Sequence, residues 1–420
     1  MPPSSELRFD SPTPDNSPER RPTARAEILV FADYYLPGFK AGGPIRCLAN
    51  MVNGLGDNFD FKVVTRDRDF GDSRPYPGVK QNTWQAFGKA KVLHLSPEHL
   101  GARTLRRVIA ESSSRVVYLN SFFSPVFALQ TLVLRWLGAL PPISFIVAPR
   151  GEFSPSALKL KKTKKLLYLL LAKSLRLYKD VLWQASNRTE EEDIRRCFGA
   201  AVRIAVAPDV SAPILSRTER IREGKRPGQI KVAFASRISR IKNLDAALKM
   251  LTRLNGQIEF NIYGPLEDKS YWAACASTIT TLPRNISVKY HGAIEHEQVG
   301  QVLSKNHLFF LPTLGESYGH AIVEAMLAGC PVLISDKTPW RDLENKRVGW
   351  DLPLTRTDLF ENALQTCIDM DETTYSLWSA SAQAYAMNIV DQNRGTELTR
   401  SLFDRALASS DGSAISAGRR

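Results

Sequence analysis

The sequence contains few cysteines. Its 420 residues include five, an odd number, and no two of them have the C-x-x-C spacing. A disulfide framework or a zinc ribbon is therefore not expected, and this usage is typical of a reducing cytoplasm. The six histidines show no H-E-x-x-H pattern, so the sequence predicts no zinc site of that type.

Long apolar segments are equally scarce. The first twenty residues have no apolar core, so we expect no signal peptide. Residues 116–134 carry no charge, but Asn120, Ser121, Pro125 and Gln130 interrupt the run. A buried strand, a turn and a helix explain this segment better than a membrane span. Apolar residues still make up 43% of the chain, which excludes a protein that is mainly disordered.

Acidic residues are outnumbered by basic ones. The 43 Asp and Glu residues against 56 Lys and Arg residues leave a net charge of +13. This charge predicts attraction to nucleic acid, to a phosphate-bearing ligand or to an anionic membrane surface. Residues 158–182 alone hold eight cations and one anion, mixed with leucines. They predict either a helix that rests on an anionic leaflet or a helix with a core face and a basic, solvated face.

The order of apolar and polar segments predicts two α/β halves. Strand-like runs alternate with helical patterns, which is typical of a parallel sheet with helices on both faces. The expected strands are 28–31, 61–64, 91–95, 116–119 and 144–147 in the first half and 231–235, 259–263, 287–291, 308–312 and 332–335 in the second. We therefore predict an α/β protein of two Rossmann-like domains facing a central cleft, where ligands usually bind.

Composition suggests the domain boundaries. Residues 1–25 contain six prolines, and residues 211–229 are polar with two prolines and two glycines. The expected parts are a disordered tail (1–25), an N-terminal domain (26–210), a linker (211–229), a C-terminal domain (230–385), helices that pack back on the N-terminal domain (386–408) and a second disordered tail (409–420).

Three motifs could carry chemistry. In LPGFKAGGPIRCLANMV, Gly42 and Gly43 precede a helix whose N-terminus can bind phosphate, although the spacing is not G-x-G-x-x-G and an ordinary tight turn is the alternative. In VAFASRISRIKNLDAAL, Arg237 and Lys242 lie between a strand and a helix and could clamp a diphosphate. Two solvated loop charges are the alternative there.

The third motif, LFFLPTLGESYGHAIVEAMLAGCPVLIS, is the most specific. Glu316 lies in a loop and Glu324 within the following helix, eight positions later. Eight helical residues span at most ~12 Å, whereas a carboxylate pair of the glycosidase type is separated by ~5–9.5 Å. We therefore expect the two carboxylates to contact different parts of one elongated ligand. A helix with one exposed Glu and one capping Glu is the alternative.

These motifs resemble the retaining, nucleotide-sugar-dependent glycosyltransferases of family 4, which have the GT-B fold. Four motifs occur in that family's order: the glycine-rich loop, the Arg–Lys pair, a YGP segment at residues 263–265 and the E-x7-E signature. The resemblance covers about residues 27–390. The segment 148–165 also resembles a subgroup that acts on bacterial surface polysaccharides. The resemblance implies that the N-terminal domain is on the acceptor side and that the C-terminal domain binds the nucleotide sugar.

The resemblance also implies a role for each site residue. Arg237, Lys242 and Glu316 would be catalytic, the first two neutralising the diphosphate leaving group and Glu316 lying by the donor sugar. Glu324 would accept hydrogen bonds from the ribose. The further donor-binding residues would be Gly42, Gly43, Ser317, Tyr318, Gly319 and His320. No metal and no cofactor is expected, because the nucleotide sugar is a co-substrate.

The chain departs from the family at two places. Many members have a histidine near the reacting sugar, where this sequence reads Pro149-Arg150-Gly151-Glu152. We expect Arg150 or Glu152 to contact donor or acceptor instead. The domain junction, commonly Asn-Gly, reads Asp209-Val210 here.

The expected function is transfer of a sugar from a nucleoside diphosphate to a hydroxyl of a carbohydrate or lipid-linked acceptor, with retention of configuration. The setting would be exopolysaccharide, lipopolysaccharide or capsule biosynthesis, in the cytoplasm or at the inner face of the cell membrane through residues 158–182. Two alternatives stay open: a basic nucleic-acid-binding protein, supported by charge alone, and an epimerase or phosphorylase of the same fold. We expect no nucleic acid as a partner.

Overall fold

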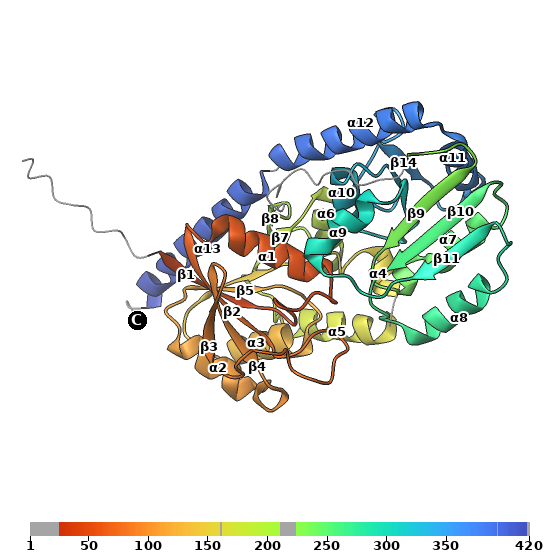
Figure 1. The fold of residues 1–420 in the computed structure, drawn as a ribbon. Helices are drawn as coiled ribbons and strands as arrows, with labels where there is room; N and C mark the ends of the chain where they lie inside the picture. Colours follow the sequence, from red (N-terminus) through yellow and green to blue (C-terminus); the bar gives the residue numbers. More distant parts are fainter. Residues whose placement is uncertain (1–24, 160–161, 211–223, 393, 418–420) are drawn as a thin grey trace, which may run out of the picture.

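The computed structural model describes residues 25–159, 162–210, 224–392 and 394–417. They form two domains, each built around a largely parallel sheet with helices packed on it (Figure 1). The predicted N-terminal tail lies outside the described residues except Arg25, and so does the predicted linker up to residue 223. The predicted fold class is confirmed.

The N-terminal domain contains an eight-stranded sheet in the order β3-β4-β2-β1-β5-β6-β7-β8, in which only β3 is antiparallel to its neighbour. The strands are β1 (Ala26–Phe31), β2 (Phe59–Arg66), β3 (Trp84–Phe87), β4 (Ala90–Leu95), β5 (Val116–Leu119), β6 (Ser144–Val147), β7 (Leu182–Ala185) and β8 (Arg203–Val206). The helical segments are α1 (Gly43–Leu55), η1 (Pro97–His99), α2 (Ala102–Glu111), the π-helical turn η2 (Pro125–Leu129), α3 (Gln130–Trp136), α4 (Pro155–Lys159), α5 (Lys162–Ser174) and α6 (Arg188–Phe198).

The alternation of side chains along β1 builds two separate cores. Ile28 and Val30 pack on the face covered by α1, whereas Leu29 and Phe31 pack on the opposite face against α2 and α3. Successive strand residues point to opposite faces, so a strand that is apolar throughout must be covered on both sides. The central position of β1 in the sheet satisfies that requirement.

The C-terminal domain contains a six-stranded, all-parallel sheet in the order β11-β10-β9-β12-β13-β14. Its strands are β9 (Gln229–Ala235), β10 (Gln257–Tyr263), β11 (Ile286–Tyr290), β12 (Leu308–Leu311), β13 (Val332–Ser335) and β14 (Gly349–Leu352). Its helices are η3 (Arg240–Lys242), α7 (Leu244–Leu251), α8 (Lys269–Ile279), α9 (His296–Ser304), α10 (His320–Leu327), α11 (Thr357–Asp369) and α12 (Glu372–Asp391). The carboxyl ends of β9, β10 and β12 therefore meet at one edge of the sheet.

Two long helices near the end of the chain connect the domains (Figure 1, blue). Helix α12 packs on the C-terminal core through Tyr375, Ala382 and Ala386. Helix α13 (Gly395–Ala417) returns to the N-terminal domain, where the Phe403 ring lies 5.3 Å from the Phe59 ring.

Residues 409–417 differ from the predicted tail, because α13 continues to Ala417, and residues 418–420 lie outside the described residues. These small, polar residues gave no apolar pattern, but a helix already docked on a core extends at one hydrogen bond per residue. Among the described residues, no helix is both long enough and apolar enough to cross a membrane.

Candidate active site

A cavity of about 270 Å³ lies between the two domains. The loop after β1 and the start of α1 line it from the N-terminal domain, and the loops after β9, β10 and β12 line it from the C-terminal domain. All but one of the predicted site residues line this cavity: Gly42, Gly43, Arg150, Arg237, Lys242, Glu316, Ser317, Tyr318, Gly319, His320 and Glu324. The exception is Glu152.

The glycine-rich loop brings the start of α1 against the second domain. Gly42 precedes the helix with a φ of +69°, a conformation that residues other than glycine rarely adopt. A Cβ placed on Gly42 would lie 3.7 Å from Nε of Arg237, and one on Gly43 would lie 3.9 Å from the His320 ring. Both are ordinary contact distances. The backbone angle of Gly42, rather than a lack of space, therefore requires glycine there.

The two predicted cations are both paired with carboxylates. Arg237, which follows β9, donates a 2.8 Å hydrogen bond from Nη1 to Glu267, and its side chain is 29% exposed. Lys242, at the end of η3, donates from Nζ to Glu316, and both of these side chains are largely buried. An anionic ligand in the cavity would therefore meet cations that are already held in place.

The two glutamates of the third motif face different groups. Glu316 pairs with Lys242, whereas Glu324, on α10, lies 3.7 Å from Nδ1 of His296 and interacts with the charge of Arg46. Burial lowers the pKa of His296, and the nearby Arg46 lowers it further. Glu316 and Glu324 thus line the same cavity but pair with different side chains.

Two side chains hold the loop between β12 and α10 in place by donating hydrogen bonds to its carbonyl groups. The side-chain amide of Asn187 donates to the Ser317 carbonyl at 2.6 Å, and the Trp340 indole donates to the Tyr318 carbonyl at 2.7 Å. Gly319 then precedes α10 with a φ of +82°. The loop is thereby fixed from both domains, and it points the first turn of α10 at the cavity.

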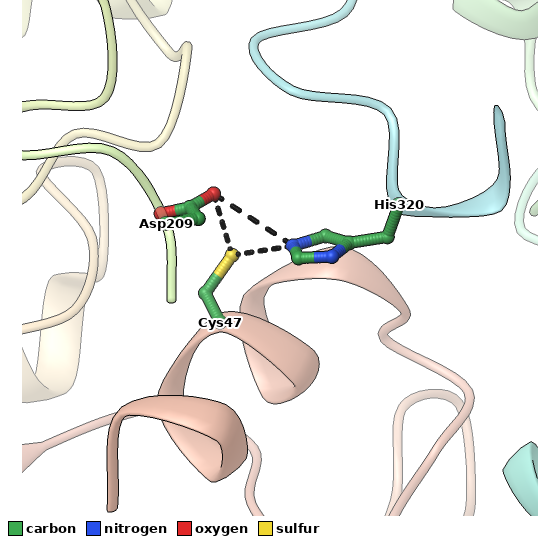
Figure 2. A group of neighbouring side chains, drawn as sticks. All are labelled: Cys47, Asp209 and His320. Atoms are coloured by element: carbon green, nitrogen blue, oxygen red, sulfur yellow. Dashed lines mark hydrogen bonds and ion pairs between the residues drawn. The ribbon is translucent and has the colours of Figure 1, made fainter. Parts of the chain in front are cut away.

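Three side chains from both domains meet at the cavity wall (Figure 2). Cys47 of α1 donates from Sγ to Oδ2 of Asp209 at 2.9 Å, and Nε2 of His320 lies 3.1 Å from that sulfur and 3.7 Å from Oδ2. Burial acts to raise the pKa of Asp209, but Arg150 and His320 hold it well below its usual value. Burial acts to lower the pKa of His320, but Cys47 and Asp209 raise it well above the usual range.

Of the two residues proposed to replace the missing histidine, only Arg150 reaches the cavity. Its guanidinium is 8% exposed and donates to Asp209, to Oδ1 of Asn120 at 2.9 Å and to the Tyr118 hydroxyl at 2.6 Å. Its backbone has a φ of +54°. Arg150 thus fixes the orientation of the Asp209 carboxylate.

The expectation for Glu152 is corrected. Its carboxylate is turned away from the cavity and accepts hydrogen bonds from the backbone N–H groups of Phe122 (2.6 Å) and Phe123 (3.1 Å) and from the Ser121 hydroxyl (2.8 Å). Burial raises the pKa of Glu152 to about 7. The residue holds a loop, and the sequence could not show which way its side chain points.

Of the two Asp-x-Asp spacings in the chain, at residues 67–69 and 369–371, the one near the glycine-rich loop consists of Asp67 and Asp69. Both side chains are buried, and N–H donors occupy their oxygen atoms. Asp69 accepts from the backbone N–H groups of Phe39 (2.8 Å) and Lys40 (3.1 Å), just before the glycine-rich loop. The pair therefore supports the loop that lines the cavity.

Comparison with known proteins gives one match to a family model and several similar solved structures. Residues 216–376 match the family model described as "Glycosyl transferases group 1". The structure is similar to sucrose-phosphate synthase from Thermosynechococcus elongatus, with a TM-score of 0.69 and 15% identity over 92% of this chain and 100% of that one. HepE from Anabaena, solved with UDP and glucose, gives a TM-score of 0.64 and 17% identity, again over 92% of this chain and 100% of that one.

A third similar structure is WaaG, a glycosyltransferase involved in lipopolysaccharide biosynthesis. It gives a TM-score of 0.62 and 14% identity over 90% of this chain and 99% of that one. The chain has the GT-B fold. Both domains take part in the likeness, because each comparison covers most of both chains. No curated protein matches the chain by sequence.

Within this GT-B fold, the cavity residues that sequence reasoning missed include Arg46, Cys47 and Asp209. Arg46 and Cys47 belong to the quoted glycine-rich motif and lie near the start of α1, so the beginning of that helix was the available signal. Asp209 appeared only as a departure at the domain junction. Nothing in the sequence indicates that it meets Cys47 and His320.

Proposed function

We propose that the protein is a glycosyltransferase that takes its sugar from a nucleoside diphosphate donor bound in the cavity between the domains. One observation carries the proposal: Arg237, Lys242 and the N-terminal turns of α1 and α10, contributed by both domains, line a single cavity. Helix N-termini have unpaired N–H groups and attract phosphate. The family match over residues 216–376 and the likeness to structures solved with UDP support this donor class.

The proposed chemistry uses these charges where negative charge develops. Breaking the bond between the sugar and the diphosphate leaves a charged leaving group, and preorganised cations stabilise it most in a site with little water. Lys242 would exchange part of its contact with Glu316 for the diphosphate, which brings Glu316 beside the sugar. Glu324 would accept hydrogen bonds from the ribose, where His296 and Arg46 position its carboxylate.

A panel of nucleotide sugars tests the donor. The protein should hydrolyse one of them slowly, or transfer its sugar, and that donor should raise the melting temperature. Lys242→Ala and Glu324→Ala should each lower the rate at least ~10-fold, which corresponds to about 1.4 kcal/mol. The matched controls are Lys249→Ala and Glu397→Ala, whose exposed side chains lie on α7 and α13. Full activity in both cavity variants would refute the roles assigned here.

We further propose retention of configuration and an acceptor of the surface-polysaccharide type. The support is the resemblance of the motifs to family 4 and the similarity to WaaG, whose role is in lipopolysaccharide biosynthesis. Proton NMR of the first-formed product decides the stereochemistry, since the anomeric coupling distinguishes the two configurations. An inverted product would refute retention without affecting the donor proposal, and a free epimerised sugar would favour the epimerase alternative.

Helix α5 supports a location at an anionic membrane surface. Leu166, Leu167, Leu170 and Leu171 are each more than half exposed, whereas Leu169 and Ala172 pack on the core. At 100° per residue the exposed leucines share one face, opposite the buried pair. The exposed lysines at 162, 164 and 173 flank that face. An apolar stripe bordered by lysines is typical of a helix that lies in a membrane interface.

Vesicle flotation tests this location. The protein should bind vesicles that contain phosphatidylglycerol, and bind phosphatidylcholine vesicles much less. Leu167→Glu with Leu170→Glu should reduce the bound fraction severalfold. Leu377→Glu, on α12, is the matched control because Leu377 is 57% exposed in the other domain. Equal binding by the α5 variant and the control would refute a role for α5.

A further inference from the structure

The cluster of Cys47, Asp209 and His320 brings three different ligand types to one point. Its atoms come from α1, from the end of the N-terminal domain and from the start of α10 in the C-terminal domain (Figure 2). Sγ, Oδ2 and Nε2 all lie within 4.8 Å of one another, and all three residues line the cavity. Neither the proposed transfer reaction nor the predicted donor contacts uses the thiol.

We propose that these three side chains bind a divalent ion of the zinc type, with the fourth coordination position open to the cavity. The proposal goes beyond the transferase function, which needs no metal. Thiolate, imidazole and carboxylate are the three ligand types that zinc prefers in proteins. A sulfur donor disfavours Mg²⁺ and Ca²⁺, which take oxygen ligands.

The distances suit such an ion. The separations are 2.9 Å between Sγ and Oδ2, 3.1 Å between Sγ and Nε2, and 3.7 Å between Nε2 and Oδ2. Zinc lies ~2.3 Å from sulfur and ~2.0–2.2 Å from nitrogen or oxygen. One ion can reach all three atoms at these bond lengths, and a small side-chain movement of Sγ away from Oδ2 and Nε2 would open the angles toward the tetrahedral arrangement that zinc prefers. The ion would lie to one side of the plane of the three atoms, which leaves a position for water or for a phosphate oxygen.

The surroundings orient the ligands. Arg150 donates to Oδ1 of Asp209, so that Oδ2 is left to face Cys47 and His320. Such an outer contact on a ligating carboxylate is usual at metal sites. Binding releases the thiol proton and the imidazolium proton as the doubly charged ion enters. The net charge beside the Arg150 guanidinium is therefore unchanged.

A bound ion would join the two domains. Cys47 and Asp209 belong to one domain and His320, the first residue of α10, belongs to the other. We infer that the ion holds the cavity closed and occupies the edge of the space where the diphosphate is proposed to bind. Zinc would then inhibit transfer. This consequence rests on the proposed function, whereas the binding itself does not.

Cobalt spectroscopy tests the site directly. The full chain, freed of metal with a chelator, is titrated with Co²⁺, whose bond to a thiolate gives a charge-transfer absorption in the near ultraviolet. We expect one ion per chain with that band, and displacement of Co²⁺ by Zn²⁺. Cys47→Ser should abolish the band, and His320→Ala should weaken binding at least tenfold. Cys197→Ser, a buried thiol on α6 outside the cavity, should keep the band.

Other outcomes overturn the proposal. Absence of the band in the wild-type protein, or its persistence in Cys47→Ser, would refute the site. Melting curves verify that each variant folds, and Zn²⁺ should raise the melting temperature of the wild type but not that of Cys47→Ser. If Co²⁺ binds and Zn²⁺ leaves the transfer rate unchanged, the inhibitory role is refuted and the site stands. If no donor is used at all, the proposed function fails while the spectra still decide the metal site.

Discussion

The side-chain amide of Asn187 donates a 2.6 Å hydrogen bond to the carbonyl oxygen of Ser317, and these two residues belong to different domains. Close by, a Cβ on Gly151 would lie only 1.8 Å from Oγ of Ser317. The loop before α10 therefore rests directly on two segments of the N-terminal domain. These contacts set how far the domains can close over the cavity.

Removing the Asn187 bond should weaken donor binding more than it weakens the fold. Asn187 also caps α6 by accepting from the N–H of Glu190 at 2.8 Å. Asn187→Ser keeps a capping oxygen but cannot reach Ser317. Because one hydrogen bond contributes about 1 kcal/mol, we expect KM for the donor to rise severalfold with little change in melting temperature. An unchanged KM would show that this contact does not matter for closure.

A methyl group at Gly151 should hold the domains apart. Gly151 has a φ of +78°, and its added Cβ would overlap the Ser317 hydroxyl. We expect Gly151→Ala to lower kcat/KM at least ~10-fold. Ser317→Ala in the same chain removes the overlapping oxygen and should restore part of the activity. If the second substitution restores nothing, the loss comes from backbone strain alone.

Neutralising Glu316 should strengthen nucleotide binding and at the same time lower kcat. Lys242 would lose its carboxylate partner in Glu316→Gln, so that its charge is left to the diphosphate. We expect tighter binding of the nucleoside diphosphate, measured by calorimetry, together with a fall in kcat. Glu267→Gln is a useful comparison because it frees Arg237 in the same way. Weaker nucleotide binding by Glu316→Gln would contradict this view of the ion pair.

Protonation of Glu152 should stabilise the protein in mild acid. Burial raises the pKa of this carboxyl from the ordinary 4.5 to about 7. Its contribution is therefore full below pH 4.5 and is lost as the pH rises to 7, because over that range the unfolded chain releases the proton first. The difference in the free energy of unfolding is about 3 kcal/mol.

The variant Glu152→Gln isolates this effect. Its amide does not titrate, so denaturant unfolding between pH 4.5 and 7 should show a smaller fall in stability than the wild type. Glu397→Gln, on an exposed part of α13, is the control. Parallel pH profiles for the wild type and Glu152→Gln would mean that folding leaves the pKa of Glu152 unchanged.

Much of the fold could be predicted because its central strands are apolar throughout. Residues 28–31, 116–119 and 308–311 are buried on both faces, and such runs need helices on either side wherever they occur. Strands β3, β7, β8 and β14 were not predicted, although they are as long as the predicted β5, β6, β12 and β13. β7 contains Gln184, and β14 contains Asp351, so neither has a continuous apolar run. They are strands because a neighbouring strand supplies their hydrogen bonds.

The candidate site likewise contains residues that the sequence could predict and residues that it could not. The amino-acid sequence by itself determined the motifs that contain Gly42, Arg237, Lys242, Glu316 and Glu324, since each motif follows a parallel strand into the next helix, and the carboxyl ends of such strands meet at one edge of a sheet. Only the tertiary structure decided that Arg150 faces the cavity while Glu152 does not, and that Cys47, Asp209 and His320 meet. The physical reason is the distance along the sequence over which each feature is decided. Strand ends are local consequences of pattern, whereas a contact between domains depends on how two complete cores pack, which no short stretch of residues encodes.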